Sequence, residues 1–375
     1  MRKKKDPGAL ASSPSMALTD ALPVLFFAAS AVLVSLTFKS VLFCIGAALC
    51  VLAGLGKVLW KLIKAINGRN IRVLFLQMRA LMPAGFLLII ISLFADHADF
   101  YAVWRNITGF PCVLLFSAGA LCMTAMAVLA LTADPGSSRA NRTEQTVNAA
   151  GQLFILLGVA IIWYASDSYA ATDKADAYLS GNASVAVSET DSGLFFDGPG
   201  SESALIFYPG GKVEYTAYAP LMTKIAQGGT DCFLCEMPYN LAVFGINAAD
   251  KAINNYSYDR WFVGGHSLGG AMASGFADGR ADISGLILLG AYPVSQPGCP
   301  SLLIYGSNDG VLDRGKLQTG LSYPNAAGLE IPGGNHAGFG CYGKQSGDGE
   351  SDITAGEQWD ITEKAIREFV DSLSL

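Results

Sequence analysis

A serine in a glycine-flanked pentapeptide is the residue of this chain whose surroundings most favour nucleophilic chemistry. Ser267 is the centre of GHSLG at 265–269, which follows an apolar run and opens a stretch with helical periodicity. In a tight strand-to-helix turn, side chains at the two glycine positions would collide with the neighbouring strand and helix. We therefore predict that Ser267 occupies a strained turn with its hydroxyl exposed as a nucleophile.

A serine hydroxyl is a weak nucleophile until a base takes its proton, and a histidine is the usual base. The chain has three histidines. His97 lies among the apolar segments of the first half, and His266 adjoins the nucleophile in a turn that should direct its side chain elsewhere. His336 lies in the loop GGNHAG at 333–338, after a short apolar run. By position and by elimination, His336 is the predicted base.

The histidine in turn needs an acid that holds its ring in the useful tautomer. The apolar run Leu302–Tyr305 leads into GSNDG at 306–310, which offers Asp309 at the end of a predicted strand. Asp313 competes for this role, but a short acid just before a helix is better explained as an N-cap. We favour Asp309, which gives the chain order Ser267, Asp309, His336.

Acyl transfer also needs backbone N–H donors for the oxyanion that forms on the substrate. The residue after the nucleophile, Leu268, should supply one donor. The loop YPGGK at 208–212 follows another apolar run and should supply the second from Gly211, with Gly210 or Lys212 as alternatives. Asn240 and Phe244 follow the next predicted strand and are the expected walls of the substrate site.

The order of elements from Ser184 onward suits these positions. Short β-rich runs alternate with amphipathic stretches, which predicts a mostly parallel sheet with helices on both faces. The stretch between the predicted strands ending at Leu289 and beginning at Leu302 is too short for a helical cap over the site. The expected strands are 185–187, 194–197, 204–208, 232–237, 260–264, 283–289, 302–305 and 328–331, and the expected helices include 215–227, 248–254 and 356–373.

Four motifs in this half resemble a bacterial α/β-hydrolase family often described with dienelactone hydrolases and carboxylesterases. They are FYPGGKV at 207–213, MPYNLAVF at 237–244, GGHSLGG at 264–270 and GGNHA at 333–337. The resemblance covers about residues 184–375. It implies an α/β-hydrolase fold with a Ser-Asp-His triad, and a serine where true dienelactone hydrolases use cysteine. Fold membership does not choose a substrate.

The first half of the chain has a different composition. The whole chain is 51% hydrophobic and 15% charged, with a mean hydropathy of +0.38. Most of its apolar segments approach the roughly 20 residues that a membrane-spanning helix needs. The third segment is the weakest, because it contains Pro83 and spans only if it extends back past Arg79. The five segments are 17–38, 41–63, 80–95, 109–133 and 149–166.

Cationic loops stay on the cytoplasmic side of a membrane. Eight Lys and Arg residues lie from the end of the second segment to the start of the third or between the fourth and fifth, whereas the alternate loops hold only Lys39 and Arg105. This asymmetry predicts a cytoplasmic N-terminus and, after five crossings, an extracytoplasmic second half. We expect a multi-pass domain at 1–171, a polar linker at 172–183 and an α/β-hydrolase domain at 184–375.

The remaining reactive residue types suggest no cofactor. The sequence shows no metal-binding cluster, and Cys232 and Cys235 lie three apart on a predicted strand, where they would face opposite sides. Cys299 and Cys341 lie in loops and could form a disulfide in an oxidising exterior. A net charge of −6 gives no basic field for nucleic acid.

The chemistry of these residues leaves three functions open. The first is hydrolysis of a carboxylic ester of a small molecule or lipid, as in carboxylesterases and lipases, through an acyl-enzyme on Ser267. The second passes the same acyl group to an alcohol or amine of an envelope component. The third is a catalytically silent sensing or scaffold module on a membrane domain. We expect the first, and protein partners are not predicted.

Overall fold

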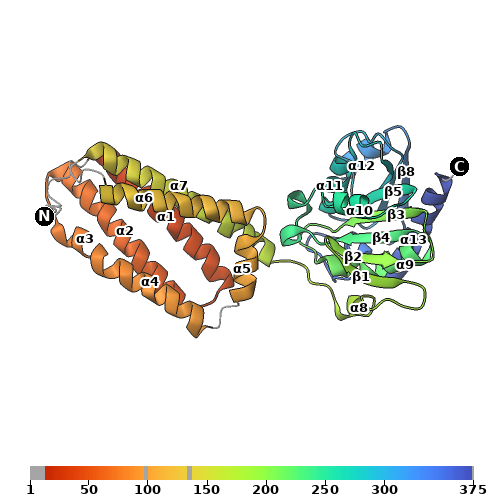
Figure 1. Ribbon diagram of the computed structural model, residues 1–375, viewed down its shortest axis with the longest axis horizontal. Helices are drawn as coiled ribbons and strands as arrows, with labels where there is room; N and C mark the ends of the chain where they lie inside the picture. Colours follow the sequence, from red (N-terminus) through yellow and green to blue (C-terminus); the bar gives the residue numbers. More distant parts are fainter. Residues whose placement is uncertain (1–12, 97–99, 133–136, 374–375) are drawn as a thin grey trace. The chain divides into compact units, whose positions relative to one another are not determined.

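The chain forms two compact units, Met1–Ser166 and Asp167–Leu375, in a computed structural model (Figure 1). The structure describes residues 13–96, 100–132 and 137–373. His97 and the predicted helix end around it therefore lie outside the described residues. We call the two units the helical unit and the sheet unit, and each is described by itself.

The helical unit contains five helices long and apolar enough to cross a membrane within its described part. The third span runs over Arg72–Ala95, so it does extend back past Arg79, with a break only at Gln77. The fifth helix begins eleven residues before the expected segment, and a short helix precedes the fourth span. The helices are α1 Pro14–Thr37, α2 Val41–Asn67, α3 Arg72–Leu76, α4 Met78–Ala95, α5 Phe100–Thr108, α6 Cys112–Thr132 and α7 Ser138–Ser166.

A buried ion pair joins three of these helices near one end of the helical unit. Lys61 Nζ on α2 lies 2.8 Å and 2.7 Å from the two carboxylate oxygens of Asp20 on α1. The same ammonium group donates to Asn141 Oδ1 on α7 at 2.7 Å, and Lys57 Nζ approaches Asp20 at 3.3 Å. Lys61 and Asp20 are 1% and 3% exposed. A charge this deeply buried needs its partner, because the partner offsets the cost of removing it from water.

Replacing Asp20 with leucine should destabilise the helical unit by about 3–5 kcal/mol, because Lys61 would remain buried without its counter-charge. The double variant Asp20→Leu/Lys61→Met should recover most of that loss, since neither charge is then left alone. Thermal unfolding of the full chain in detergent measures both. A double variant no more stable than the single one would show that the pair is not the source of the effect.

The sheet unit contains an eight-stranded sheet in the order β1-β2-β4-β3-β5-β6-β7-β8. β1 and β2 form an antiparallel hairpin, β2 pairs antiparallel with β4, and the remaining pairs are parallel. β3 and β4 are buried along their whole length, as near-continuous apolar runs in parallel sheets usually are. The strands are β1 Ala186–Thr190, β2 Gly193–Asp197, β3 Ser203–Tyr208, β4 Asp231–Cys235, β5 Arg260–His266, β6 Ile283–Leu289, β7 Ser301–Gly306 and β8 Ala326–Ile331.

Helices cover both faces of this sheet, as the alternating pattern predicts (Figure 1). α9 and α13 pack over one apolar cluster, and α10, α11 and α12 pack over the other. A short helix, α8, precedes β1, and four 3₁₀ turns lie in the connections described here. The main helices are α8 Asp173–Asp176, α9 Ala219–Gln227, α10 Ala249–Asn255, α11 Leu268–Ala277, α12 Arg314–Leu321 and α13 Ala355–Ser372.

The four cysteines of the sheet unit are free thiols. Cys232 and Cys235 face opposite clusters, as their spacing on a strand predicts, and burial raises the pKa of Cys235 to about 12. The disulfide considered between Cys299 and Cys341 is absent. The sequence left this pairing open, and the two residues belong to clusters on opposite faces of the sheet.

Residues 167–183 lie within the sheet unit, including 172–183, which we expected to form a polar linker. Tyr169 forms a parallel bridge with Val213, and the Thr172 N–H donates to the Cys341 carbonyl at 2.8 Å. Ala175 is fully buried, and Tyr178 packs against the same cluster. Although this stretch contains many polar residues, its apolar residues cover one edge of the core.

Candidate active site

Ser267 lies at the turn between β5 and α11, with φ 54° and ψ −123°. This is the left-handed region that side chains rarely adopt, and its strain is typical of functional turns. A Cβ at Gly265 would lie 2.6 Å from the Tyr208 carbonyl oxygen, and one at Gly269 would lie 2.2 Å from the Pro209 carbonyl oxygen. The two glycines therefore allow the turn to pack against the end of β3. The geometry is that of a nucleophile elbow.

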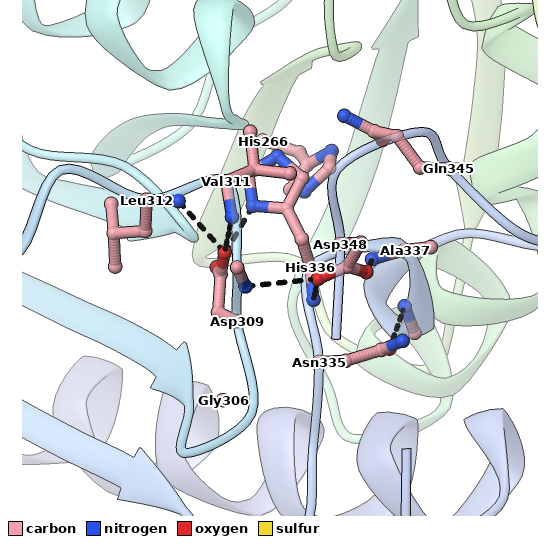
Figure 2. A network of polar contacts seen from close by, with 12 residues as sticks. His266, Gly306, Asp309, Val311, Leu312, Asn335, His336, Ala337, Gln345 and Asp348 are labelled. Atoms are coloured by element: carbon pink, nitrogen blue, oxygen red, sulfur yellow. Dashed lines mark hydrogen bonds and ion pairs between the residues drawn. The ribbon is translucent and has the colours of Figure 1, made fainter. Parts of the chain in front are cut away.

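His336 and Asp309 form a buried pair in the loops after β8 and β7 (Figure 2). His336 Nδ1 donates to Asp309 Oδ2 at 2.8 Å, and both side chains are almost inaccessible. The other oxygen, Asp309 Oδ1, accepts the N–H groups of Val311 at 2.9 Å and Leu312 at 2.8 Å, which holds the carboxylate in place. His336 Nε2 is buried and has no hydrogen-bond partner among the described residues. That nitrogen is free to take a proton.

The end of β6 brings the serine turn and the His336–Asp309 pair to one place. The Ser267 N–H donates to the Leu289 carbonyl at 2.9 Å. The next residue, Gly290, has φ 51°, and a Cβ there would lie 2.9 Å from His336 Nδ1 and 3.2 Å from Asp309 Oδ2. Gly290 thus provides the space that the pair occupies beside the serine turn. Its role was not predicted, because a glycine after an apolar strand signals only a turn.

Asp313 serves a different purpose from Asp309. Its carboxylate accepts the N–H groups of Gly315 at 3.0 Å and Lys316 at 3.1 Å, so it caps the N-terminus of α12 as expected.

Of the three residues considered for the second oxyanion donor, two already use their N–H groups. The Gly210 N–H donates to the Tyr218 hydroxyl at 3.1 Å, and the Lys212 N–H donates to the Asn240 carbonyl at 2.7 Å. Gly211 lies between them, and a Cβ there would come within 2.8 Å of the Leu268 side chain. The Leu268 N–H belongs to the first turn of α11, where such groups lack helical partners. Gly211 and Leu268 therefore remain the predicted oxyanion donors, and they lie close together.

The expected substrate walls lie in the segment after β4. Tyr239 and Asn240 both have positive φ, 56° and 54°, so the chain reverses sharply there. Through its carbonyl, Asn240 holds the loop that carries Gly211. Phe244 packs edge to face on Tyr239, with ring centroids 6.2 Å apart. The backbone of Asn240 thus contacts the loop that carries Gly211. The side-chain type of Asn240 did not suggest this contact.

His266, set aside in the sequence, lies in the centre of the site. Its ring centroid is 4.4 Å from that of His336, and its Nδ1 is hydrogen-bonded to the Tyr218 hydroxyl at 2.7 Å. Burial, and then the neighbouring His336, holds the pKa of His266 well below its ordinary value. His266 is therefore a neutral packing partner of His336. Through the Tyr218 hydroxyl, His266 connects the His336 ring to Gly210. Gly210 lies in the loop that carries Gly211, which we call the oxyanion loop.

Asp348 is another residue whose role the sequence did not reveal (Figure 2). Its Oδ1 accepts the N–H groups of His336 and Gly310, each at 3.1 Å, and its Oδ2 accepts that of Ala337 at 2.8 Å. One carboxylate thus joins the loop of His336, the predicted base, to the loop of Asp309, the predicted acid. An aspartate in a glycine-rich loop is a common turn residue, so its sequence carries no signal of this role.

Replacing Asp348 with alanine should lower kcat by about ten- to hundredfold, because small displacements of catalytic groups cost that much. KM should change little, since no substrate contact is removed. Glu350→Ala is the matched control, because that side chain is exposed in the same loop and pairs only with Lys344 among the described residues. Equal effects of the two variants in steady-state assays would contradict a positioning role for Asp348.

Among the residues that the structure describes, no group of three or more His, Cys, Asp or Glu side chains could hold a metal ion.

A strained serine turn, a buried His-Asp pair and a mostly parallel sheet covered on both faces define an α/β-hydrolase fold. Residues 204–360 match the model of the Alpha/beta hydrolase family. The predicted fold class is therefore confirmed. The crystal structure of TT1662 from Thermus thermophilus is similar at 15% identity, covering 50% of this chain and 98% of that one, with a TM-score of 0.38. A comparison with curated proteins finds no match.

Proposed function

We propose that the sheet unit is a serine hydrolase that cleaves carboxylic esters through an acyl-enzyme. The observation that carries this proposal is the buried His336–Asp309 pair, whose unpartnered Nε2 lies in the same site as the strained Ser267 turn. Ser267 Oγ attacks the ester carbonyl and its proton passes to His336 Nε2. The N–H groups of Leu268 and Gly211 stabilise the oxyanion. The proton then passes to the departing alcohol, and water hydrolyses the acyl-enzyme by the same base.

The connection between β6 and β7 supports an open substrate site. It covers residues 290–300 and contains no helix, so no cap arises at that point of the fold. An open cleft admits esters of different acyl length, which agrees with a carboxylesterase or lipase-like enzyme.

Turnover of a series of p-nitrophenyl esters of increasing acyl length, with product analysis by mass spectrometry, tests this proposal. Release of free carboxylic acid supports hydrolysis. Acyl products that appear only with an added alcohol or amine would instead assign the enzyme to acyl transfer. No turnover and no acyl-enzyme with any ester would reject catalysis and favour a silent sensing module.

We also propose that the helical unit anchors this enzyme in the cell membrane with the N-terminus in the cytoplasm and the sheet unit outside. The orientation rests on the clustering of Lys and Arg in alternate connections, among them Lys64, Arg69 and Arg139. Five helices able to cross then carry the chain to the opposite side.

Alkaline phosphatase fused after Ser166 should be active, because the fusion point follows the fifth crossing, and a cytoplasm-only fluorescent reporter there should be dark. Ser166 is the suitable junction because the residues after it belong to the sheet unit. The same reporters fused after Gly68, beyond the second crossing, provide the control and should give the reverse pattern. Fluorescence after Ser166 would return the hydrolase to the cytoplasm.

A further inference from the structure

The helical unit contains a cavity of about 240 Å³ to which all five long helices contribute. Its walls are mostly apolar and rich in methionine and phenylalanine, side chains that suit a hydrocarbon ligand. The lining residues used below are Val24 and Phe27 on α1, Met82 and Phe86 on α4, Met123 and Met126 on α6, and Asn148 and Gln152 on α7.

Two amides form the polar part of this wall. Asn148 and Gln152 are four residues apart on α7, so they lie on one face of the helix. Asn148 Oδ1 is buried without a hydrogen-bond partner among the described residues, and Gln152 Nε2 meets only the Met123 sulfur, at 3.8 Å. An unsatisfied polar atom is costly in such surroundings, particularly in a membrane, where no water replaces the missing partner. A ligand hydroxyl beside Asn148 would remove that cost.

The cavity lies close to one membrane face. The ion pair of Asp20, Lys61 and Asn141 marks one end of the helices. On α1 the lining residues lie three to seven positions after Asp20, and on α7 they lie seven to eleven positions after Asn141. Their distance from the ion pair is therefore about 5–17 Å along the helix axes. Asn148 and Gln152 are the last polar residues before the continuously apolar part of α7, which begins at Leu153. Lipid head groups and the first part of their chains occupy this depth.

The size of the cavity restricts what it can hold. An apolar cavity of about 150 Å³ accommodates a benzene molecule, and drug-sized pockets measure about 300–1,000 Å³. At about 240 Å³, the cavity is larger than a benzene-sized cavity and smaller than a drug-sized pocket. It therefore has room for one hydrocarbon chain segment with a small polar group, and not for a whole two-chain lipid.

We propose that the helical unit binds a single-chain amphiphile from the membrane, with a hydroxyl of its head group donating to Asn148 Oδ1 and its chain lying among Phe27, Phe86 and Met126. Phe27 and Phe86 form an edge-to-face pair, with centroids 6.4 Å apart, that provides an aromatic wall for the chain. This site is separate from Ser267, so it does not depend on the proposed esterase activity. The helical unit is then a lipid-binding domain as well as an anchor.

The probe for this proposal is a 1-O-alkylglycerol with a diazirine in its chain, added to the full chain in phosphatidylcholine nanodiscs. Its ether bond cannot be cleaved as an ester, and all variants carry Ser267→Ala, so the result is independent of the active site. Light should cross-link the probe to peptides that contain Met82, Phe86, Met123 or Met126. Unlabelled alkylglycerol should compete, and an ether of the same chain length without hydroxyl groups should compete less.

Two variants and one control make the test specific. Met126→Trp fills the cavity and should lower specific cross-linking at least tenfold, and Asn148→Leu removes the hydrogen-bond acceptor and should weaken competition about five- to thirtyfold. Leu121→Trp enlarges a 71% exposed side chain on the same helix and should change neither. Cross-linking that resists competition, or that is equal in Met126→Trp and Leu121→Trp, would show contact with bulk lipid only and overturn the proposal.

Discussion

Replacing Ser267 with alanine is expected to abolish covalent labelling by a fluorophosphonate and to lower kcat by on the order of 10⁶-fold. Without the hydroxyl no acyl-enzyme forms, and the oxyanion donors alone leave only a small residual rate. The backbone of the turn should survive, because alanine is smaller than serine and Gly265 and Gly269 still let the turn pack against the end of β3. Intact-protein mass spectrometry and ester turnover measure the two losses.

Ser322→Ala is the matched control for this experiment. Ser322 is an exposed serine at the C-terminal end of α12, and its hydroxyl donates only to the Thr319 carbonyl at 2.7 Å. Labelling and turnover should match those of the parent. A Ser267→Ala variant that still acquires one fluorophosphonate adduct would place the nucleophile elsewhere and reject the mechanism.

Much of the fold is predictable because its signals are local. Mostly apolar runs mark the strands of a parallel sheet, and β6 begins and ends at Ile283 and Leu289, as expected. Asp313 caps a helix as its position before α12 predicts. The burial of Ala175, within the expected linker 172–183, was not predicted, because it depends on an edge of the core that only the folded sheet unit presents.

The contacts around the candidate site depend on residues far apart in the chain, and for this reason the sequence did not reveal them. His266 meets His336 across 70 positions, because β5 and the loop after β8 end at the same edge of the sheet. Asp348 reaches back to Gly310 across 38 positions. Single residues in glycine-rich loops carry no periodicity, so their partners become visible only once the strands are placed.

Tyr218 and His266 suggest how the two halves of the candidate site keep their spacing. The Tyr218 hydroxyl joins the Gly210 N–H to His266 Nδ1, and the His266 ring packs on His336. Burial raises the pKa of Tyr218 and lowers that of His266, so both stay neutral across the physiological range. The oxyanion loop and the base are thereby connected without a charge that would compete with Asp309 for the ring of His336.

Comparison of Asp309→Asn with Asp313→Asn tests which aspartate is the catalytic acid. In Asp309→Asn the oxygen that accepts the Val311 and Leu312 N–H groups can remain, so the loop should keep its shape. The amide then presents a donor to His336 Nδ1, which favours the tautomer with its proton on Nε2, where the proton of Ser267 must go. We expect kcat/KM to fall by on the order of 10⁴-fold with little change in thermal stability.

Asp313→Asn should have almost no effect on turnover, because asparagine is as good an N-cap as aspartate and the N–H groups of Gly315 and Lys316 keep their acceptor. Steady-state kinetics with one p-nitrophenyl ester and thermal unfolding of both variants make the comparison. If Asp313→Asn were the damaging change and Asp309→Asn the mild one, Asp313 would be the catalytic acid. The 2.8 Å contact between His336 and Asp309 leads us to expect the opposite ranking, because it already places a carboxylate oxygen at the ring nitrogen that must be held.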